Sequence, residues 1–279
     1  MELPISPQSY QPDASALVRA IHTAAITLAQ TTAKETSIDC ADLYVQSDRP
    51  GIRAVNFAAQ VQPVANLPAD QQIQQILDEF QTMQATCEVI LPAGLELSAS
   101  LSAAAIAQGY RPAARQVFLM QGYRRPARIN TELQIVPARA IYSQLDAFYQ
   151  HQARTEFHAT DKLAQDFART MVDFLDDTRL EVFIARLQGK NVACAGVMSL
   201  GQIGVIVPAW SDPALRGQGL AGTLMSHVMD LCARALFQQV ILDRAEHCPA
   251  IGFYESLGFK SVARFVKYRR HQEGSTLHG

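Results

Sequence analysis

The sequence predicts an α/β (α+β) fold of two domains, each a mixed, mostly antiparallel sheet flanked by helices. Its 279 residues, 48% of them hydrophobic, are enough for two ordinary domains with apolar cores. Short apolar runs bounded by glycine alternate with stretches of helical periodicity. One order of segments also occurs twice along the chain, which favours two related domains.

The repeat pairs residues 108–117 with 257–266, and upstream it pairs 88–91 with 239–242. Both copies have a Gly-aromatic-basic step followed by Ala-Arg-x-Val, after an apolar run and a short helical stretch. We therefore expect each copy to form a strand, a short helix, a glycine turn and a second strand.

The first domain is expected at residues 1–125. Apolar periodicity and bounding polar residues predict its elements, with Asp13 or Ser15 as the first helix cap. These elements are helices at 15–30 and 71–84 and strands at 43–45 and 53–61. A polar, proline-bearing stretch at 123–130 predicts the linker between the domains.

The second domain is expected at residues 131–270, followed by a flexible tail at 271–279. Its predicted elements are a strand at 133–136, helices at 139–151 and 162–175, strands at 180–185, 192–200 and 203–210, a helix at 220–235 and a strand at 239–243. Tight joints at Gly189-Lys190 and Gly201-Gln202 predict that the three middle strands pair as antiparallel hairpins.

Segment 216–221, Arg-Gly-Gln-Gly-Leu-Ala, carries the clearest chemical signal. It comes just before a helical stretch in which Leu220, Leu224 and Val228 share one apolar face. The start of a helix has unpaired N–H groups and partial positive charge, and glycine lets an anion approach the bare backbone. The segment therefore predicts a cradle for a pyrophosphate.

Other interpretations of this segment depend on its surroundings. A P-loop is excluded, because Leu-Ala rather than Lys-Ser/Thr follows Gly219. Gly217, Gly219 and Gly222 match the Gly-x-Gly-x-x-Gly pattern of dinucleotide-binding folds, but they follow strands that look antiparallel. Asp243 lies near the distance at which that fold places an acidic residue, so this alternative stays open. A glycine-rich turn before an ordinary helix is a further alternative.

Two motifs resemble signatures of the GCN5-related N-acetyltransferases (GNAT). Arg216-x-x-Gly219-x-Ala221 is similar to the acyl-CoA pyrophosphate loop of that family. Residues 250–259, Ala-Ile-Gly-Phe-Tyr-Glu-Ser-Leu-Gly-Phe, look like its second signature. The resemblance covers about the last half of the chain. It implies acyl-CoA N-acyltransferase-like domains and an N-acetyltransferase that uses acetyl-CoA as co-substrate.

The first copy of the repeat lacks both features. Residues 64–70, Val-Ala-Asn-Leu-Pro-Ala-Asp, precede its long helix and contain neither glycine nor an Arg-x-x-Gly pattern. Ala105, or a near neighbour, stands where the second copy has Tyr254. We therefore expect a tandem arrangement whose N-terminal copy is degenerate and binds no CoA.

Pro208 interrupts the third strand of the second domain. Proline cannot donate to a strand ladder, so it occurs at edges or bulges. The resemblance implies a bulge here and a slot in which backbone groups of Ala209 and Ser211 pair with the pantetheine arm. The alternative is that the strand ends at Val207.

His247 stands where the family often has asparagine. The residues expected to contact the donor are Ala209, Trp210, Ser211, Arg216, Gly217, Gln218, Gly219, Leu220, Ala221, Gly222, His247 and Tyr254.

Acyl transfer to an amine needs a neutral amine and a proton for the departing thiolate. The resemblance implies that Tyr254 is the general acid, and a phenol with an ordinary pKa of about 10 is protonated at neutral pH. Packing beside Phe253 is the alternative role for this side chain.

The strand at 203–210 lacks the glutamate that many family members carry. The possible bases are Glu156, His158, Asp161, Asp243 and Glu246; a reaction without a base, in which the amine arrives neutral, is also open.

Charge and cysteine content disfavour several classes of function. A net charge of −2 and a pI near 6.4 disfavour nucleic-acid and anionic-membrane partners. Five scattered cysteines without a Cys-x-x-Cys pattern predict free thiols and disfavour both a metal site and a disulfide framework. No signal-peptide pattern and no apolar run of about 18 residues is present, so we expect a cytoplasmic protein.

The acceptor is expected to be a small-molecule or peptide amine, and the protein a monomer or homodimer. Three alternatives to an acetyltransferase stay open: a non-catalytic acyl-CoA-binding or sensing protein, an interaction protein that binds no CoA, and an aminoacyl or other acyl transferase of the same fold.

Overall fold

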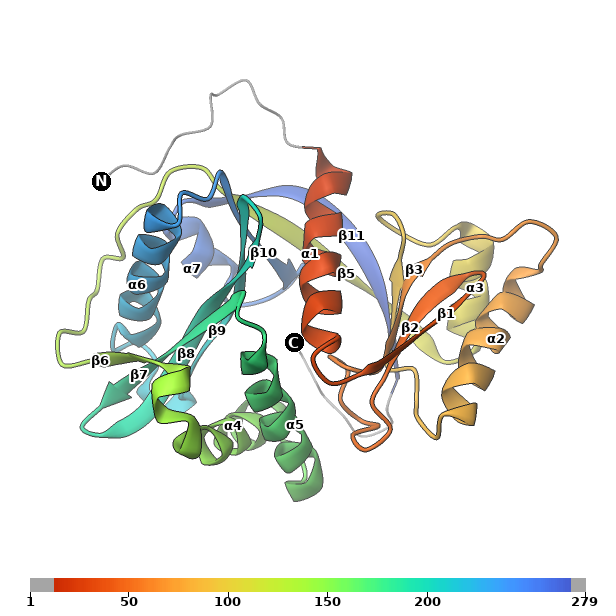
Figure 1. The fold of residues 1–279 in the computed structure, drawn as a ribbon. Coiled ribbons are helices and arrows are strands. Elements are labelled where there is room, and N and C mark those ends of the chain that lie inside the picture. Colours follow the sequence, from red (N-terminus) through yellow and green to blue (C-terminus); the bar gives the residue numbers. More distant parts are fainter. Residues whose placement is uncertain (1–12, 272–279) are drawn as a thin grey trace. The chain divides into compact units, whose positions relative to one another are not determined.

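The computed structural model describes residues 13–271, which form two compact units (Figure 1). The C-terminal unit comprises residues 118–262. Among the described residues, the N-terminal unit comprises 13–117 together with 263–271. Residues 1–12 and the predicted tail beyond His271 lie outside the described residues.

The N-terminal unit has three helices and a mixed sheet among its described residues. Its elements are α1 (Ala14–Ala29), β1 (Lys34–Ile38), β2 (Ala41–Val45), β3 (Phe57–Val61), α2 (Ala69–Thr82), β4 (Val89–Pro92), α3 (Ala99–Ala107) and most of β5 (Tyr110–Met120). The strand order is β1-β2-β3-β4-β11-β5, where β11 is Phe259–Arg270. Of the described pairings, β3 with β4 is parallel and those of β1–β2, β2–β3 and β4–β11 are antiparallel.

The C-terminal unit follows the predicted element order. Its elements are β6 (Gln134–Pro137), α4 (Tyr142–Phe157), α5 (Asp161–Asp173), β7 (Leu180–Leu187), β8 (Lys190–Leu200), β9 (Ile203–Ser211), α6 (Leu220–Arg234), β10 (Gln239–Ala245) and α7 (Ile251–Ser256), with short 3₁₀ turns at Ala138–Ile141, Phe174–Asp176 and Pro213–Leu215. The strand order is β10-β9-β8-β7-β6. The predicted antiparallel hairpins of β7, β8 and β9 are confirmed.

The core of the C-terminal unit lies between one face of this sheet and helices α6 and α7. Phe183 and Ala185 alternate with residues of the other face, and they pack with Leu224 and Val228 of α6. On the opposite face, Trp210 of β9 packs against Phe148 of α4, with ring centroids 5.4 Å apart. Helices therefore cover both faces of the sheet, as the sequence predicts.

The internal repeat is confirmed as a repeat of structure. Both copies contain a strand, a short helix, a glycine turn and a strand, namely β4-α3-β5 and β10-α7-β11. The turn glycines have φ values of +84° at Gly109 and +102° at Gly258. A Cβ atom at Gly258 would lie 1.9 Å from the carbonyl oxygen of Gly122, so no residue with a side chain fits at this position.

Two elements of the N-terminal unit differ from the sequence prediction. Strand β1 was not expected, because its sequence Lys-Glu-Thr-Ser-Ile is polar; it is an exposed edge strand paired with β2. The strand expected at 53–61 begins only at Phe57. The side chain of Asn56 explains this, because its amide donates to the carbonyl oxygens of Arg49 and Ile52 and holds the preceding residues in turns.

The compact units also divide the chain differently from the expected boundaries. The sequence places residues 263–270 in the second domain, but they belong to the N-terminal unit, where Tyr268 and Arg269 of β11 pair with Ile90 and Val89 of β4. Strand pairing of this kind is set by the tertiary fold, and the local pattern of the strand does not reveal it.

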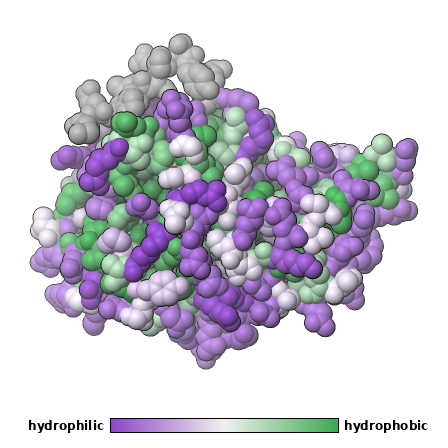
Figure 2. All heavy atoms as spheres, viewed as in Figure 1, coloured by the Kyte–Doolittle hydropathy of each residue, from purple (hydrophilic) through white to green (hydrophobic). Residues whose placement is uncertain are grey.

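Hydrophobic side chains on the surface are scattered. Among the described residues, the large exposed ones are Ile106, Ile129, Tyr142 and Leu236. Figure 2 shows hydrophilic and hydrophobic residues interspersed on the face in view.

Candidate active site

Strands β9 and β10 run parallel and then separate. Their paired residues end with Val205 opposite Ile241, although β9 continues to Ser211 and β10 to Ala245. Against β8, Gly196 pairs with Val207 and Cys194 pairs with Trp210, so Pro208 and Ala209 together stand opposite one residue. This arrangement is a β-bulge, and the bulge predicted at Pro208 is confirmed.

The loop after β9 leads directly into helix α6. Asp212 caps a short 3₁₀ turn by accepting a hydrogen bond of 2.9 Å from the amide of Ala214. Gly217 and Gly219 then take φ values of +81° and +79°, which favour glycine. Gly219 is the N-cap of α6, and no side chain caps the first turn. The N–H groups at this helix start are therefore free of a side-chain partner and suit an anion.

The linker between the predicted domains packs beside this loop. The guanidinium of Arg128 donates to the carbonyl of Gly217, and the amide of Asn130 donates to that of Gln218 over 3.2 Å. A Cβ atom at Gly219 would lie 3.1 Å from Arg128, whereas one at Gly217 would meet open space. Sequence reasoning treated residues 123–130 only as a connection and missed this contact.

The predicted donor-contact residue Gly222 lies within the first turn of α6. A Cβ atom there would lie 2.9 Å from Pro126 of the linker. The glycine therefore permits close packing of the linker, and its contact with a donor stays a prediction. Of the predicted loop residues, Arg216, Gly217 and Gln218 are exposed, while Leu220 is buried beneath them.

The C-terminal end of α4 approaches the loop through one of the predicted bases. Glu156 forms an ion pair with Arg216. Asp161 instead pairs with Arg154 at 3.1 Å, and its side chain is 83% exposed. His158 ends α4 in a left-handed conformation with φ +51°. The structure thus brings Glu156 to the loop, and it does not bring Asp161 into contact with it.

A histidine–carboxylate pair that sequence reasoning missed lies at the end of β9. Nε2 of His151, on α4, is 2.9 Å from Oδ2 of Asp212. Burial acts to raise the pKa of Asp212, but hydrogen bonds from Ala214 and His151 and the nearby charge of Arg216 hold it below its ordinary value. Since the carboxylate accepts a hydrogen from Nε2, the neutral ring keeps its lone pair on Nδ1.

Trp210 lies beside this pair. Its ring meets His151 edge to face at 6.0 Å, and its side chain is buried. Its indole Nε1 has no hydrogen-bond partner among the residues that the structure describes. The two other predicted contacts on this strand, Ala209 and Ser211, are half-buried.

Tyr254 is almost completely buried on α7, with 1% of its surface exposed. Its ring packs against Phe253 and Phe259, at 5.2 and 6.0 Å between centroids. Its hydroxyl accepts a hydrogen bond from the guanidinium of Arg244 on β10. That guanidinium also lies 4.6 Å from the centre of the tyrosine ring. Sequence reasoning did not single out Arg244, because its charge gives no sign that it points inward.

The remaining predicted residues lie in the turn after β10 or on the strand itself. His247 is exposed in the turn, Glu246 is half-buried beside it, and Asp243 is half-buried on β10.

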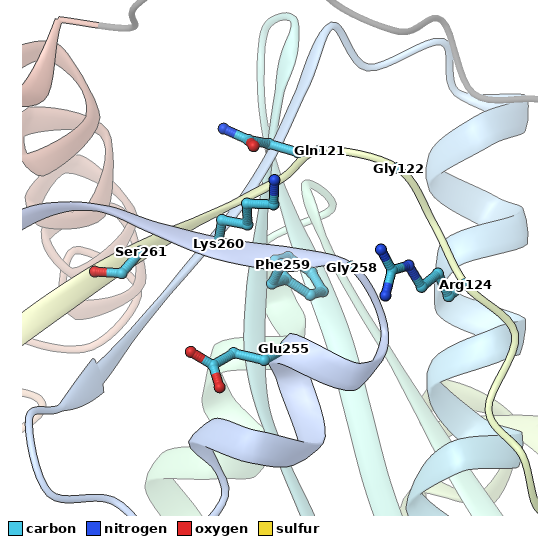
Figure 3. A pocket seen from close by; sticks show the side chains of 8 residues that line it. All are labelled: Gln121, Gly122, Arg124, Glu255, Gly258, Phe259, Lys260 and Ser261. Atoms are coloured by element: carbon cyan, nitrogen blue, oxygen red, sulfur yellow. The ribbon is translucent and has the colours of Figure 1, made fainter.

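A separate surface cavity of about 280 Å³ lies at the Gly258 turn. Figure 3 shows Arg124, Lys260 and Glu255 around it. None of the predicted donor-contact residues lines this cavity.

Comparison with known proteins agrees with this geometry. Residues 140–259 match the model of the acetyltransferase (GNAT) family. No curated protein sequence matches the chain. Among the described residues, no helix is long and apolar enough to cross a membrane, and no group of three or more His, Cys, Asp or Glu residues is placed to hold a metal ion.

Solved structures share the fold over most of the chain. A conserved protein of unknown function from Staphylococcus epidermidis ATCC 12228 has a TM-score of 0.60 and 12% identity, covering 86% of this chain and 95% of its own. A GCN5-related N-acetyltransferase from Kribbella flavida has a TM-score of 0.58 and 10% identity, covering 91% and 95%. A tandem GNAT protein from the clavulanic acid biosynthesis pathway has a TM-score of 0.52 and 15% identity, covering 82% and 77%.

The strand separation, the bulge and the uncapped helix start all lie within the matched residues. Residues 140–259 thus form the part of this chain that is similar to the acetyltransferase (GNAT) family.

Proposed function

We propose that this protein transfers an acetyl group from acetyl-CoA to a primary amine, by direct attack within a ternary complex. One observation carries the proposal. The separation of β9 from β10 is followed directly by a glycine loop whose N–H groups, at the start of α6, have no side-chain cap. Such a helix start favours a diphosphate. The match of residues 140–259 to the acetyltransferase (GNAT) family model supports the same class of reaction.

The donor would lie along β9 and over the loop. Exposed Gly217 and the amides up to Ala221 suit the diphosphate, because the Cα of Gly217 faces open space. The bulge at Pro208 leaves the end of β9 apart from β10, which supports pairing of Ala209 and Ser211 with the pantetheine arm. Contacts of Trp210 and His247 with the donor are further proposals.

Tyr254 would supply the proton that the departing thiolate takes. The amine nitrogen attacks the thioester carbon, the carbon–sulfur bond breaks, and its electron pair leaves on sulfur. A proton from the phenol then neutralises the sulfur. The arrangement that supports this role is a hydroxyl that already accepts from Arg244 and keeps its own hydrogen to donate.

We assign to His151 the role of general base, which accepts the proton that the amine loses. Glu156 is committed to Arg216, and the carboxylate of Asp212 accepts from both Ala214 and His151. The hydrogen bond to Asp212 uses Nε2 of His151 and leaves the Nδ1 lone pair available. The side chain of His151 is about half exposed, at 48%. A carboxylate that orients a histidine is a recurrent general-base arrangement. Glu156, His158 and Asp161 stay predictions as direct bases.

The acceptor class is proposed only as a small-molecule or peptide amine. A monomer or homodimer without nucleic-acid or membrane partners stays our expectation, as does a cytosolic location. Transfer of another acyl group, including an aminoacyl group, is the second outcome that a donor panel would reveal.

Thiol release with a panel of amines and acetyl-CoA, combined with calorimetric titration of CoA, tests the proposal. We expect binding of CoA and amine-dependent release of free thiol. Binding without release for any amine would favour a non-catalytic acyl-CoA sensor, which the lack of a glutamate on β9 would suit. No binding at all would contradict both and favour an interaction protein.

A further inference from the structure

Arg244 is a buried cation on the separated part of β10. It lies three positions beyond Ile241, where pairing with β9 ends, and it is only 7% exposed. Its side chain donates to the Tyr254 hydroxyl and to the carbonyl of Asp243. The ion pairs of the described residues include no carboxylate partner for it. Burying a charge without a counter-ion is costly, so the position calls for an explanation.

The alternation along β10 places Arg244 on the same face as Val240 and Leu242. Those two residues belong to the core that α6 and α7 cover. A residue at this position would ordinarily be apolar. The guanidinium instead lies 4.6 Å from the centre of the Tyr254 ring, and a cation over an aromatic face gains a modest attraction that only partly offsets its burial.

The internal repeat provides a comparison within the same chain. Matching 88–91 with 239–242 places Ala93 at the position of Arg244. Matching 108–117 with 257–266 places Ala105 at the position of Tyr254. The copy without a phosphate cradle thus lacks both members of the pair. Packing alone does not require the pair, since Ala105 is fully buried in the core of the N-terminal unit.

We propose that Arg244 is the positioning residue for the general acid Tyr254. Its N–H occupies a lone pair of the phenol oxygen, so the hydroxyl hydrogen must point away from the guanidinium. As the carbon–sulfur bond breaks, the electron pair goes to sulfur and the phenol proton follows it. The phenolate left behind carries its charge beside Arg244 until water returns a proton. This inference rests on the proposed function.

A double-mutant cycle tests the inference, because it isolates the coupling between the two side chains. The variants are Arg244→Met, Tyr254→Phe and the pair together, assayed by thiol release from acetyl-CoA with the best amine of the panel. We expect Arg244→Met to lower kcat roughly 10- to 100-fold with KM for acetyl-CoA nearly unchanged. In the Tyr254→Phe background, the same change should lower kcat by less than about threefold.

Conservative and control variants separate positioning from folding. Arg244→Lys keeps the cation and should recover part of kcat, whereas Arg124→Met, at an exposed arginine of the same unit, should leave kcat unchanged. Equal losses from Arg244→Met in both backgrounds would overturn the inference while leaving the proposed function intact. Loss of thermal stability with unchanged kcat would also overturn it. A wild-type protein without turnover for any amine would overturn both.

Discussion

Tyr254 combines a buried ring with a hydroxyl that has a hydrogen-bond partner. Its ring fills the core between Phe253 and Phe259, as the packing interpretation requires. Its hydroxyl accepts a hydrogen bond from Arg244, and its role as general acid stays a proposal. The sequence motif could predict the tyrosine, because the motif is local. It could not predict Arg244, whose inward direction depends on β10 lying beside α7.

Tyr254→Phe removes the hydroxyl and keeps the ring. We expect CoA affinity to stay nearly unchanged, because the ring still packs, and kcat to fall roughly 10- to 1000-fold. The free energy of unfolding should fall by about 1–3 kcal/mol, since the Arg244 donor loses its partner. Calorimetric titration, thiol release and urea unfolding give the three values. A kcat equal to that of the wild type would remove Tyr254 from the mechanism.

His151→Gln tests the assignment of the amine proton. Glutamine keeps a donor for Asp212 but cannot take a proton, so kcat should fall about 10- to 100-fold with CoA affinity unchanged. Steady-state kinetics with the best amine measures this. An unchanged kcat at neutral pH would show that the amine arrives neutral without His151. The pair joins residues 61 positions apart, which explains why sequence patterns did not reveal it.

At the scale of elements, the loop before α6 was the most predictable part of the site. Its glycines, the helix after it and the proline in β9 act through local backbone geometry, and the structure has the bulge and both positive φ values. The contact of Arg128 with Gly217 was not predictable, because it bridges residues 89 positions apart. Local conformation could be inferred, whereas partners distant in the sequence could not.

Gly217→Ala, compared with Gly189→Ala, tests the loop. The two glycines have φ values of +81° and +80°, and a Cβ atom at either would meet no protein atom within 4 Å. Both variants should lose similar stability, on the order of 1–2 kcal/mol, from left-handed strain. Only Gly217→Ala should weaken CoA binding, by about tenfold or more, because its methyl group occupies the approach of the diphosphate. Equal CoA affinity for the two variants by calorimetric titration would contradict the cradle.

At the scale of the whole molecule, the two copies share an order of elements but not a donor site. The N-terminal unit has Pro68 before α2, with no side-chain cap and no glycine in the preceding loop. The order of elements followed from sequence periodicity. The pairing of Tyr268 and Arg269 with β4 did not, because the sequence of a strand does not determine which strand it pairs with.

The number of CoA molecules bound per full-length chain tests the prediction that the first copy of the repeat binds no CoA. Titration of the full-length protein with CoA should saturate at one CoA per chain, because only the C-terminal unit has the loop. In Gly217→Ala, the same single site should weaken and no second site should appear. Saturation at two per chain would contradict the assignment.

Buried thiols make stability depend on pH. Burial raises the pKa of Cys87 to about 11 and those of Cys194 and Cys232 to about 12, from an ordinary value of 9.0. Above pH 9.0 the unfolded chain therefore binds fewer protons than the folded one, and the free energy of unfolding falls until the folded pKa values are passed. Below that window the contribution is fully present. Over the first pH unit above 9.0, we expect the three thiols together to lower the free energy of unfolding by a few kcal/mol.

Urea unfolding from about pH 8 to about pH 10 measures this loss. Comparison with Cys232→Ala isolates one thiol, because the variant should show a shallower decline. A decline equally steep in both proteins would contradict the contribution of Cys232.

The central claim is that backbone amides around residues 216–221 bind the diphosphate of an acyl-CoA donor. A crystal structure of the full chain soaked in acetyl-CoA tests it most directly. We expect the diphosphate against the N–H groups of Gly217, Gly219 and the first turn of α6, with the pantetheine arm between β9 and β10. A donor bound elsewhere, or a loop left empty in a donor-saturated crystal, would contradict the account.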